Sequence, residues 1–362
     1  MLSADRDNFL EKYVDRKSDF DKRSCSECFR HYDLDRDGVL KQTEFDGLLT
    51  DLFCDGGQPY TITSQVLSQF MDLLDIDKDG KINKKEFMEN SFYWLKQILQ
   101  PVSALVIVDV QNDFLDGSLS LRNCPAGQDG NGVIPAINSV LDTVTFDLVV
   151  YTRDWHPADH ISFIENVDKR PLQTNSHKTQ MPPKVLDTVV FEGPPVTEQK
   201  LWPSHCVQGS WGAKIHPDLK FVEGGVIVDK GMRSDVDSYS AFWDNNKLAE
   251  TDLVRILSKH KVTDVYLCGV AYDVCVGSTG LHALEHGYRT VLIEDAARGV
   301  NLDDISNMRK TLQEKGAVIT NSCKVKDLVE GVDRQVALGY QTAKNVALAR
   351  SMVKEGVVKK TE

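Results

Sequence analysis

The sequence contains no long hydrophobic run. Its longest apolar stretches, such as residues 104–108, are far shorter than the roughly 20 residues that a membrane-spanning helix needs. The first ten residues, MLSADRDNFL, contain no apolar core of the kind that a secretory signal has. These absences favour a soluble, unsecreted protein. We expect no membrane partner and a cytoplasmic location, with the nucleus as an additional compartment.

Cysteines are few and scattered. Eight occur among 362 residues, without the tight spacing of a disulfide framework. This usage is typical of a reducing compartment, in which thiols are available for chemistry. Cys25 and Cys28 form a single CxxC, but no second cysteine or histidine pair accompanies it. The sequence therefore does not indicate a zinc site there, and we expect both cysteines on one turn of a helix.

An excess of basic residues is also absent. The formal net charge is −12 at pH 7, and half of that acidic excess lies in the first 100 residues, which contain two acidic motifs. Bound cations would offset much of it, so no basic partner is implied and nucleic acid is not expected as a partner. The sequence does not indicate an oligomeric state.

The residue pattern changes near Pro101. Before it, amphipathic helical segments alternate with acidic loops. After it, short β-branched runs alternate with helical patterns, which predicts an α/β domain with a parallel sheet covered on both faces, next to a separate all-α domain. The predicted strands are residues 104–108, 148–152, 226–229, 264–270, 290–294 and 317–320. The predicted helices are residues 134–144, 246–260, 274–286 and 302–315.

The predicted domains are therefore residues 1–100 and residues 101–335, followed by a C-terminal tail at 336–362 that forms a surface helix. Residues 165–200 are polar, contain several prolines and have weak periodicity. We interpret them as a long loop that is a candidate cover for a site.

Two twelve-residue acidic segments, residues 33–44 and 75–86, match the EF-hand loop position by position. Aspartates at positions 1, 3 and 5 supply hard oxygen ligands, position 7 supplies its backbone carbonyl, and glutamate at position 12 supplies both carboxylate oxygens. Glycine at position 6 permits the sharp turn. The predicted Ca²⁺ ligands are Asp33, Asp35, Asp37, Val39 and Glu44 in the first loop and Asp75, Asp77, Asp79, Lys81 and Glu86 in the second.

The two loops differ at position 9. Lys41 occupies it in the first loop, and an ammonium group cannot be a ligand, so we expect a water there and a weaker first site. Leu40 and Ile82, at position 8 of each loop, are expected side by side in the short strand pairing that makes one domain of the two EF-hands.

Polar or reactive side chains follow four of the predicted strands. Asp109 follows the first strand, Asp154 and His156 follow the second, Lys230 ends the third, and Cys275 comes shortly after the fourth. Because the carboxyl ends of parallel strands meet at one edge of a sheet, we expect these side chains to gather there.

These motifs make the second domain resemble the nicotinamidases of the isochorismatase-like hydrolase family over residues 101–335. The resemblance rests on VDVQNDF at 108–114, DWH at 154–156, WPSHC at 202–206 and GVAYDVC at 269–275. It implies an enzyme that hydrolyses nicotinamide to nicotinate and ammonia through a thioester acyl-enzyme, in NAD salvage. An isochorismatase is disfavoured, because such enzymes lack the nucleophilic cysteine.

The resemblance also implies roles for individual residues. The catalytic residues it implies are Asp109, Lys230 and Cys275, with an oxyanion hole at Ala271 and Cys275 that includes a cis peptide between Val270 and Ala271. The transition-metal ligands it implies are Asp154, His156 and His205, with His160 as a further ligand in some members. The residues it implies around the pyridine ring are Phe114, Trp202 and Tyr239.

Elementary chemistry agrees with the catalytic roles. Cys275 lies where a strand turns into a helix, so we expect the helix N-terminus and the Lys230 ammonium to lower its pKa and favour the thiolate. Asp109 can accept the thiol proton and return it to the departing ammonia. Each backbone donor to the developing oxyanion contributes about 3–4 kcal/mol.

The metal set combines one carboxylate with two imidazoles, which suits Zn²⁺, Fe²⁺ or Mn²⁺ without choosing among them. We expect the metal to hold the ring nitrogen of nicotinamide. Two alternatives stay open: an amidohydrolase of another small amide, and a calcium-sensing binding module whose hydrolase domain is inactive.

Overall fold

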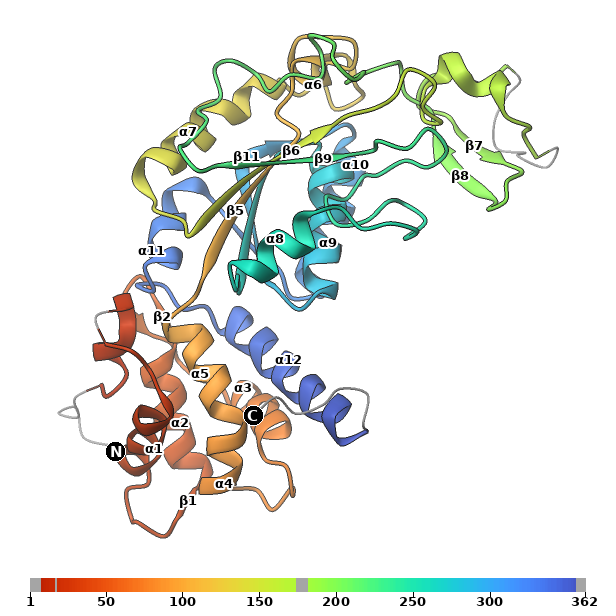
Figure 1. Ribbon diagram of the computed structural model, residues 1–362. Helices are drawn as coiled ribbons and strands as arrows, with labels where there is room; N and C mark the ends of the chain where they lie inside the picture. The colour runs from red at the N-terminus through yellow and green to blue at the C-terminus, as the bar shows by residue number, and fades with distance from the viewer. Residues whose placement is uncertain (1–7, 17, 174–181, 356–362) are drawn as a thin grey trace. The chain divides into compact units, whose positions relative to one another are not determined.

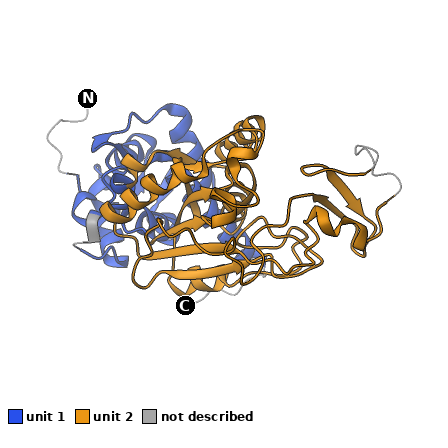
Figure 2. Ribbon diagram, turned by 90° about the horizontal axis from the view of Figure 1, so that it is seen from above, with its two compact units in different colours: residues 1–102, 326–362 blue, residues 103–325 orange. Residues whose placement is uncertain are grey.

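The computed structural model describes residues 8–16, 18–173 and 182–355 (Figure 1). The chain divides into two compact units, which Figure 2 colours separately. Unit 1 comprises residues 1–102 and 326–362, and unit 2 comprises residues 103–325. No helix of the described residues has both the length and the apolar character that crossing a membrane requires.

Unit 1 is predominantly helical. Its helices are η1 (Glu11–Arg16), α1 (Lys22–Tyr32), α2 (Gln42–Leu52), α3 (Ser64–Leu74), α4 (Lys84–Glu86), the π-helical η2 (Phe87–Ser91), α5 (Phe92–Leu99) and α12 (Val336–Lys354). Its strands are β1 (Val39–Leu40), β2 (Cys54–Asp55), β3 (Gln58–Pro59) and β4 (Ile82–Asn83). The helix α11 (Val325–Val329) spans the sequence boundary between the units.

Two local predictions for unit 1 are confirmed. β1 pairs with β4 in an antiparallel manner, with Leu40 opposite Ile82 and both side chains fully buried. Cys25 and Cys28 lie together on α1 and are also buried. The pairing gives the two acidic loops a common core.

The C-terminal segment is placed differently from the predicted division. Residues 336–362 fall within unit 1 rather than forming a separate tail, and unit 2 ends at residue 325. The helix α12 buries Leu338, Gly339 and Ala343. Its core contacts are with residues more than two hundred positions earlier, and a local sequence pattern does not reveal such contacts.

Unit 2 contains a six-stranded sheet in the order β12 (Val318–Thr320), β11 (Arg289–Arg298), β10 (Asp264–Val270), β5 (Ser103–Val108), β6 (Leu148–Asp154) and β9 (Val226–Lys230). Every adjacent pair in it is parallel. The central strands β5 and β10 are buried along their whole length, as expected for a parallel sheet covered on both faces. The predicted α/β class is confirmed.

Helices lie on both faces of this sheet. The described helices of unit 2 are α6 (Asn112–Leu115), η3 (Leu121–Asn123), η4 (Gly130–Val133), α7 (Ile134–Thr143), η5 (Ile164–Lys169), α8 (Leu253–Lys259), η6 (Tyr272–Val276), α9 (Gly277–Glu285), α10 (Leu302–Glu314) and η7 (Ser322–Lys324). The connections through α7 and α9 run in opposite directions across the sheet, so right-handed crossovers place these helices on opposite faces (Figure 1).

Two predicted elements of unit 2 differ from the structure. The helix expected from residue 246 begins only at Leu253, because the Asp244 carboxylate accepts the backbone N–H groups of residues 246, 248 and 249 and holds a turn instead. The expected loop at 165–200 contains an antiparallel hairpin of β7 (Thr188–Phe191) and β8 (Thr197–Lys200). Residues 174–181 of that loop lie outside the described chain.

Candidate active site and calcium-binding loops

Asp109 follows the buried strand β5 directly. It is fully buried and has a φ of 50°, a strained conformation for a residue with a side chain. The Thr152 hydroxyl donates a hydrogen bond of 2.6 Å to its carboxylate, and the Asp109 N–H donates to that hydroxyl oxygen at 3.2 Å. The carboxylate is therefore fixed at the carboxyl edge of the sheet.

Lys230, the last residue of β9, joins the other reactive groups. Its Nζ lies 2.9 Å from Asp109 Oδ2 and 3.3 Å from Cys275 Sγ, and it also contacts an Asp154 oxygen. A further hydrogen bond of 2.9 Å goes to the Ser238 carbonyl. Burial disfavours the ammonium, but the carboxylates of Asp109 and Asp154 outweigh it and raise the pKa of Lys230. The lysine stays charged in a fully buried position.

Cys275 lies on η6, which continues into α9 at the end of β10. The preceding Val270–Ala271 peptide is cis, as the resemblance implied. Burial raises the pKa of the Cys275 thiol, and the nearby Lys230 ammonium only partly opposes it. The expected lowering of this pKa is therefore wrong, because burial outweighs the positive charge. The thiol keeps its proton until a base removes it.

Asp109 is suited to be that base. Burial raises the pKa of its carboxyl to about 6, while Lys230 acts in the opposite direction. A carboxyl with a pKa of about 6 exchanges its proton readily near neutral pH, which is where a general acid–base residue is most effective.

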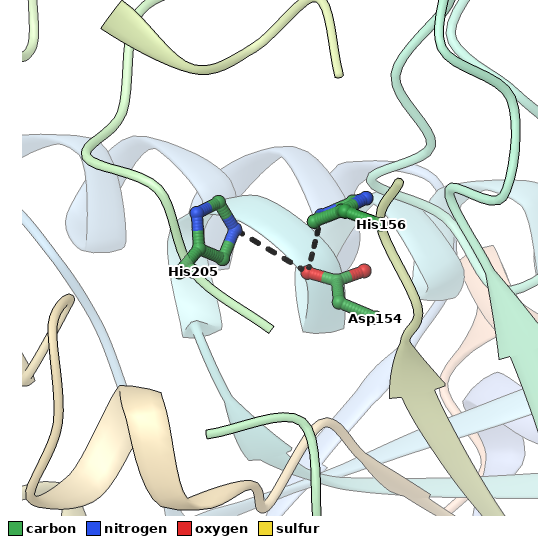
Figure 3. Close-up of side chains that lie close together, drawn as sticks. All are labelled: Asp154, His156 and His205. Carbon is green, nitrogen blue, oxygen red and sulfur yellow. Dashed lines mark ion pairs between the residues drawn. The ribbon is translucent and has the colours of Figure 1, made fainter. Parts of the chain in front are cut away.

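A second group of polar side chains adjoins the first (Figure 3). Asp154 ends β6, and its Oδ2 lies 3.5 Å from His156 Nε2 and 3.8 Å from His205 Nε2. One donor atom from each of the three residues lies within 4.8 Å of the other two, and all three side chains are buried. Burial lowers the pKa of His205 to about 4, with a further lowering from His156. A neutral imidazole with a free nitrogen is the form that binds metals.

The two imidazoles are oriented by backbone carbonyls. His156 Nδ1 lies 2.8 Å from the Gly231 carbonyl oxygen and His205 Nδ1 lies 2.9 Å from that of Pro203. These contacts favour the tautomer with hydrogen on Nδ1, which leaves both Nε2 atoms directed toward Asp154. Gly231 is needed there, because a Cβ on it would lie 2.3 Å from the His156 ring. The donor set thus fits a divalent transition metal.

His160 belongs to a neighbouring group. Its ring stacks on His156 with centroids 4.0 Å apart, and its Nδ1 lies 2.7 Å from the Ser162 hydroxyl oxygen. His160 Nε2 lies 4.0 Å from Asp237. The structure therefore groups His160 with His156 and Asp237 rather than with Asp154 and His205.

A pocket opens onto Cys275, Asp154 and His205. The residues that line it are Phe114, Leu119, Leu121, Asp154, Trp202, His205, Asp237, Tyr239, Ala271, Val274, Cys275 and Val300. All three aromatic residues expected around the substrate ring are among them, as are Cys275, the expected nucleophile, and Ala271, its partner in the expected oxyanion hole. The walls are largely apolar, with a few polar groups that include Asp154, His205 and Asp237, which suits a small flat ring with one polar substituent.

Several residues of the site escaped prediction. Thr152 and Ser238 position the catalytic groups through a hydroxyl and a carbonyl, and Gln111 bridges the Asp154 backbone through both ends of its amide. Asp237 is buried at the pocket wall, where the Gln199 amide donates to it at 2.9 Å. Thr152 lies two positions before the DWH motif, and only that proximity could have suggested it.

The two acidic loops of unit 1 have the expected turn. Gly38 and Gly80 have φ of 86° and 83° at position 6. Asp33 accepts the Gly38 N–H at 3.2 Å, and Asp75 accepts the Gly80 N–H at 2.9 Å. The two described clusters of carboxylate oxygens are Asp33 with Asp35 and Glu44, and Asp75 with Asp77 and Glu86.

The residues at position 9 of the two loops also make different contacts in the structure. The Lys41 ammonium pairs with Asp37 at 2.6 Å and also contacts Asp35. In the second loop, Asn83 occupies this position, and its Oδ1 accepts backbone N–H groups at the start of α4. A cation entering the first loop must therefore displace a lysine, whereas one entering the second loop need not.

Comparison with known proteins gives two matches to family models. Residues 103–323 match the isochorismatase domain, and residues 22–91 match the EF-hand domain pair. A nicotinamidase of Acinetobacter baylyi is 37% identical over 201 residues, covering 55% of this chain and 83% of the relative. One of Saccharomyces cerevisiae is 36% identical over 221 residues, covering 59% and 95%. A solved nicotinamidase/pyrazinamidase structure from Acinetobacter baumannii has a TM-score of 0.53 and 35% identity, covering 62% of this chain and 99% of that one.

Proposed function

The chain belongs to the isochorismatase domain family, and on that premise we propose that it is a nicotinamidase that hydrolyses nicotinamide to nicotinate and ammonia. One observation carries the proposal. A buried ammonium, Lys230 Nζ, lies 2.9 Å from Asp109 and 3.3 Å from Cys275, and Cys275 lines the same pocket as Asp154 and His205 of the proposed metal set. Nicotinate production is a step that NAD salvage can use.

The first half of the reaction transfers the acyl group to sulfur. Asp109 removes the Cys275 thiol proton, and the thiolate sulfur bonds to the carboxamide carbon while the C=O π electrons move to oxygen. The backbone N–H groups of Ala271 and Cys275 stabilise that oxyanion. Asp109 then gives its proton to the amide nitrogen, the C–N bond breaks, and ammonia leaves a thioester on Cys275.

The second half releases the acid. Asp109 accepts a proton from water as the water oxygen bonds to the thioester carbonyl carbon. The C–S bond then breaks, the sulfur takes the proton back from Asp109, and nicotinic acid leaves and loses its own proton to solvent to become nicotinate. Lys230 stays protonated throughout, and its charge stabilises the thiolate and the carboxylate in turn.

Asp154, His156 and His205 would hold a divalent transition metal, Zn²⁺, Fe²⁺ or Mn²⁺. When bound, it supplies a Lewis acid for the pyridine nitrogen of the substrate. We expect His205→Ala to weaken nicotinamide binding, measured by calorimetry. This variant is preferable to a chelator, which would also remove calcium. Unchanged nicotinamide affinity in a metal-depleted variant would contradict the role.

The proposed activity is tested directly by measuring both products. Purified full-length protein should release ammonia and nicotinate in equal amounts from nicotinamide. Benzamide, which has the same shape without the ring nitrogen, should react much more slowly if the metal set orients the ring. Failure to release ammonia from nicotinamide would remove the proposal, and equal rates on both amides would favour hydrolysis of a different small amide.

We further propose that both EF-hand loops bind Ca²⁺ through the ligands predicted above, the second loop more tightly than the first. The converging carboxylates and the glycine turns support the binding, and the Lys41 ion pairs support the ranking. Titration of calcium into the full chain by calorimetry should resolve two unequal sites. Two equal sites would contradict the ranking, and an absence of heat and of calcium retention would contradict both sites.

A further inference from the structure

The C-terminal helix α12 packs into the apolar interior of unit 1. It contacts both α3 and α5, and Ala343 is part of the buried core, with Val336, Tyr340 and Val346 packed against it. Residues 339, 343, 346 and 350 recur at the spacing that places side chains along one face of a helix. The helix α3 leads into the second acidic loop, and α5 follows it after α4 and η2, so α12 contacts helices from both sides of that loop in the sequence.

Gly339 allows α12 to approach closely. A Cβ at this position would lie 2.3 Å from the Phe53 ring and 3.4 Å from Ile98. The Gly339 carbonyl also accepts a hydrogen bond of 3.0 Å from the indole of Trp94 on α5, and both partners are buried. Glycine inside a helix is unfavourable relative to alanine, so its presence here reflects the packing.

Arg350, near the end of α12, connects the two sides of the second loop. One guanidinium nitrogen donates to the Leu73 carbonyl oxygen at 3.2 Å, at the end of the helix that enters the loop. Another donates to Asn90 Oδ1 at 3.0 Å, and Asn90 in turn donates to the Glu86 carbonyl oxygen at 2.7 Å. Glu86 is the position 12 residue of the loop. Arg350 therefore links the entering helix to the residue that closes the calcium site.

We propose that the EF-hand pair has a helix-binding groove, that its occupant is the chain's own α12, and that docking of α12 is coupled to calcium binding at the second loop. The inference rests on the proposed calcium sites. EF-hand domains bind amphipathic helices in an apolar groove, and calcium alters the angle between the helices that flank a loop. Here the groove is filled from within the chain.

The direction of the coupling follows from the loop geometry. With α12 docked, oxygens of Asp75, Asp77 and Glu86 converge to within 4.8 Å, an arrangement that like charges oppose. The contacts of Arg350 and Gly339 stabilise the helices in that arrangement, so they favour the form of the loop that is ready for a cation. Linkage then requires calcium to strengthen the docking of α12 by the same factor.

The test measures calcium affinity of the second loop in the full chain. A Glu44→Gln background weakens the first loop so that one site dominates the titration. In that background, Arg350→Ala should lower the affinity at least about fivefold, the lower end of typical coupling between sites. Gly339→Leu should lower it too, because the larger side chain displaces α12. Lys354→Ala removes the same charge from an exposed position on the same helix and should change nothing.

A second readout follows α12 itself. Hydrogen exchange of residues 336–354 should slow when calcium is added to the Glu44→Gln protein, and less so with Arg350→Ala. If calcium binds but Arg350→Ala and the control have equal affinities and equal exchange, the coupling is wrong while the calcium sites stand. If the protein with an unmodified α12 binds no calcium at all, the calcium sites and this inference are both wrong. If the Gly339→Leu protein does not fold, the calcium affinity of Arg350→Ala and the hydrogen-exchange data test the coupling without it.

Discussion

The carboxyl edge of the sheet in unit 2 and the acidic loops of unit 1 both gather carboxylates, but they balance the charge differently. Asp109 and Asp154 are buried, and Lys230 lies against both. The carboxylates of the loops are largely open to solvent at positions 3 and 5 and have backbone N–H partners. The buried carboxylates have a fully buried cation beside them and are ready for chemistry at all times. The exposed ones have backbone donors and, in the first loop, a partly exposed lysine, so they can respond to an added cation.

Removal of the Lys230 charge should have the largest effect on stability and activity. Lys230→Met leaves two buried carboxylates without their cation, so we expect the free energy of unfolding to fall by about 3–5 kcal/mol, together with loss of activity. Denaturant titration measures it. The matched control is Lys220→Met, which breaks an exposed pair with Asp142 and should change stability by less than about 1 kcal/mol. Equal effects would mean that burial does not distinguish the two kinds of site.

Removal of the base should be nearly as costly to catalysis but not to folding. Asp109→Asn keeps the size of the side chain and its Thr152 contact but cannot take the thiol proton. We expect kcat/KM for nicotinamide to fall by about 10² to 10⁴. Asp113→Asn is not a suitable control, because Asp113 accepts the Cys206 N–H. Asp142→Asn, at an exposed position, is suitable and should retain full activity.

The pH profile gives a smaller effect with a definite sign. Because the pKa of Asp109 is raised to about 6 and the carboxylate is the active form, kcat/KM should fall as the pH drops below about 6, by about tenfold per pH unit. It should not fall on raising the pH from 6 to 8. A profile flat between pH 5 and 7 would show that Asp109 titrates elsewhere or is not the base.

The smallest expected effect concerns the first calcium loop. Lys41→Asn removes the ammonium that pairs with Asp35 and Asp37 and gives this loop the residue that the second loop has. We expect its calcium affinity to rise about three- to tenfold, since one or two exposed ion pairs no longer compete. Calorimetry with the second loop disabled by Glu86→Gln measures it. An unchanged calcium affinity would show that the Lys41 ion pairs do not oppose calcium binding.

The meeting of the candidate catalytic residues could be predicted from the sequence better than the packing could. Asp109 and Cys275 follow recognisable strands and Lys230 ends one, so their meeting at one edge follows from the topology. The sign of the Cys275 pKa shift could not, because it depends on how completely the thiol is buried. The Trp94–Gly339 contact joins residues far apart in sequence, and neither residue type signals it. The hairpin of β7 and β8 was missed because each strand has only four residues and β8, TEQK, contains no apolar residue.

The central claim is that Cys275 is the nucleophile of amide hydrolysis, and ammonia release from nicotinamide by Cys275→Ala tests it most directly. Cys323→Ala, which changes an exposed cysteine, is the matched control. We predict that Cys275→Ala protein, folded and able to bind calcium, releases no ammonia above background, while Cys323→Ala matches the unmodified chain. Ammonia release by Cys275→Ala at a rate close to that of the control would contradict the account.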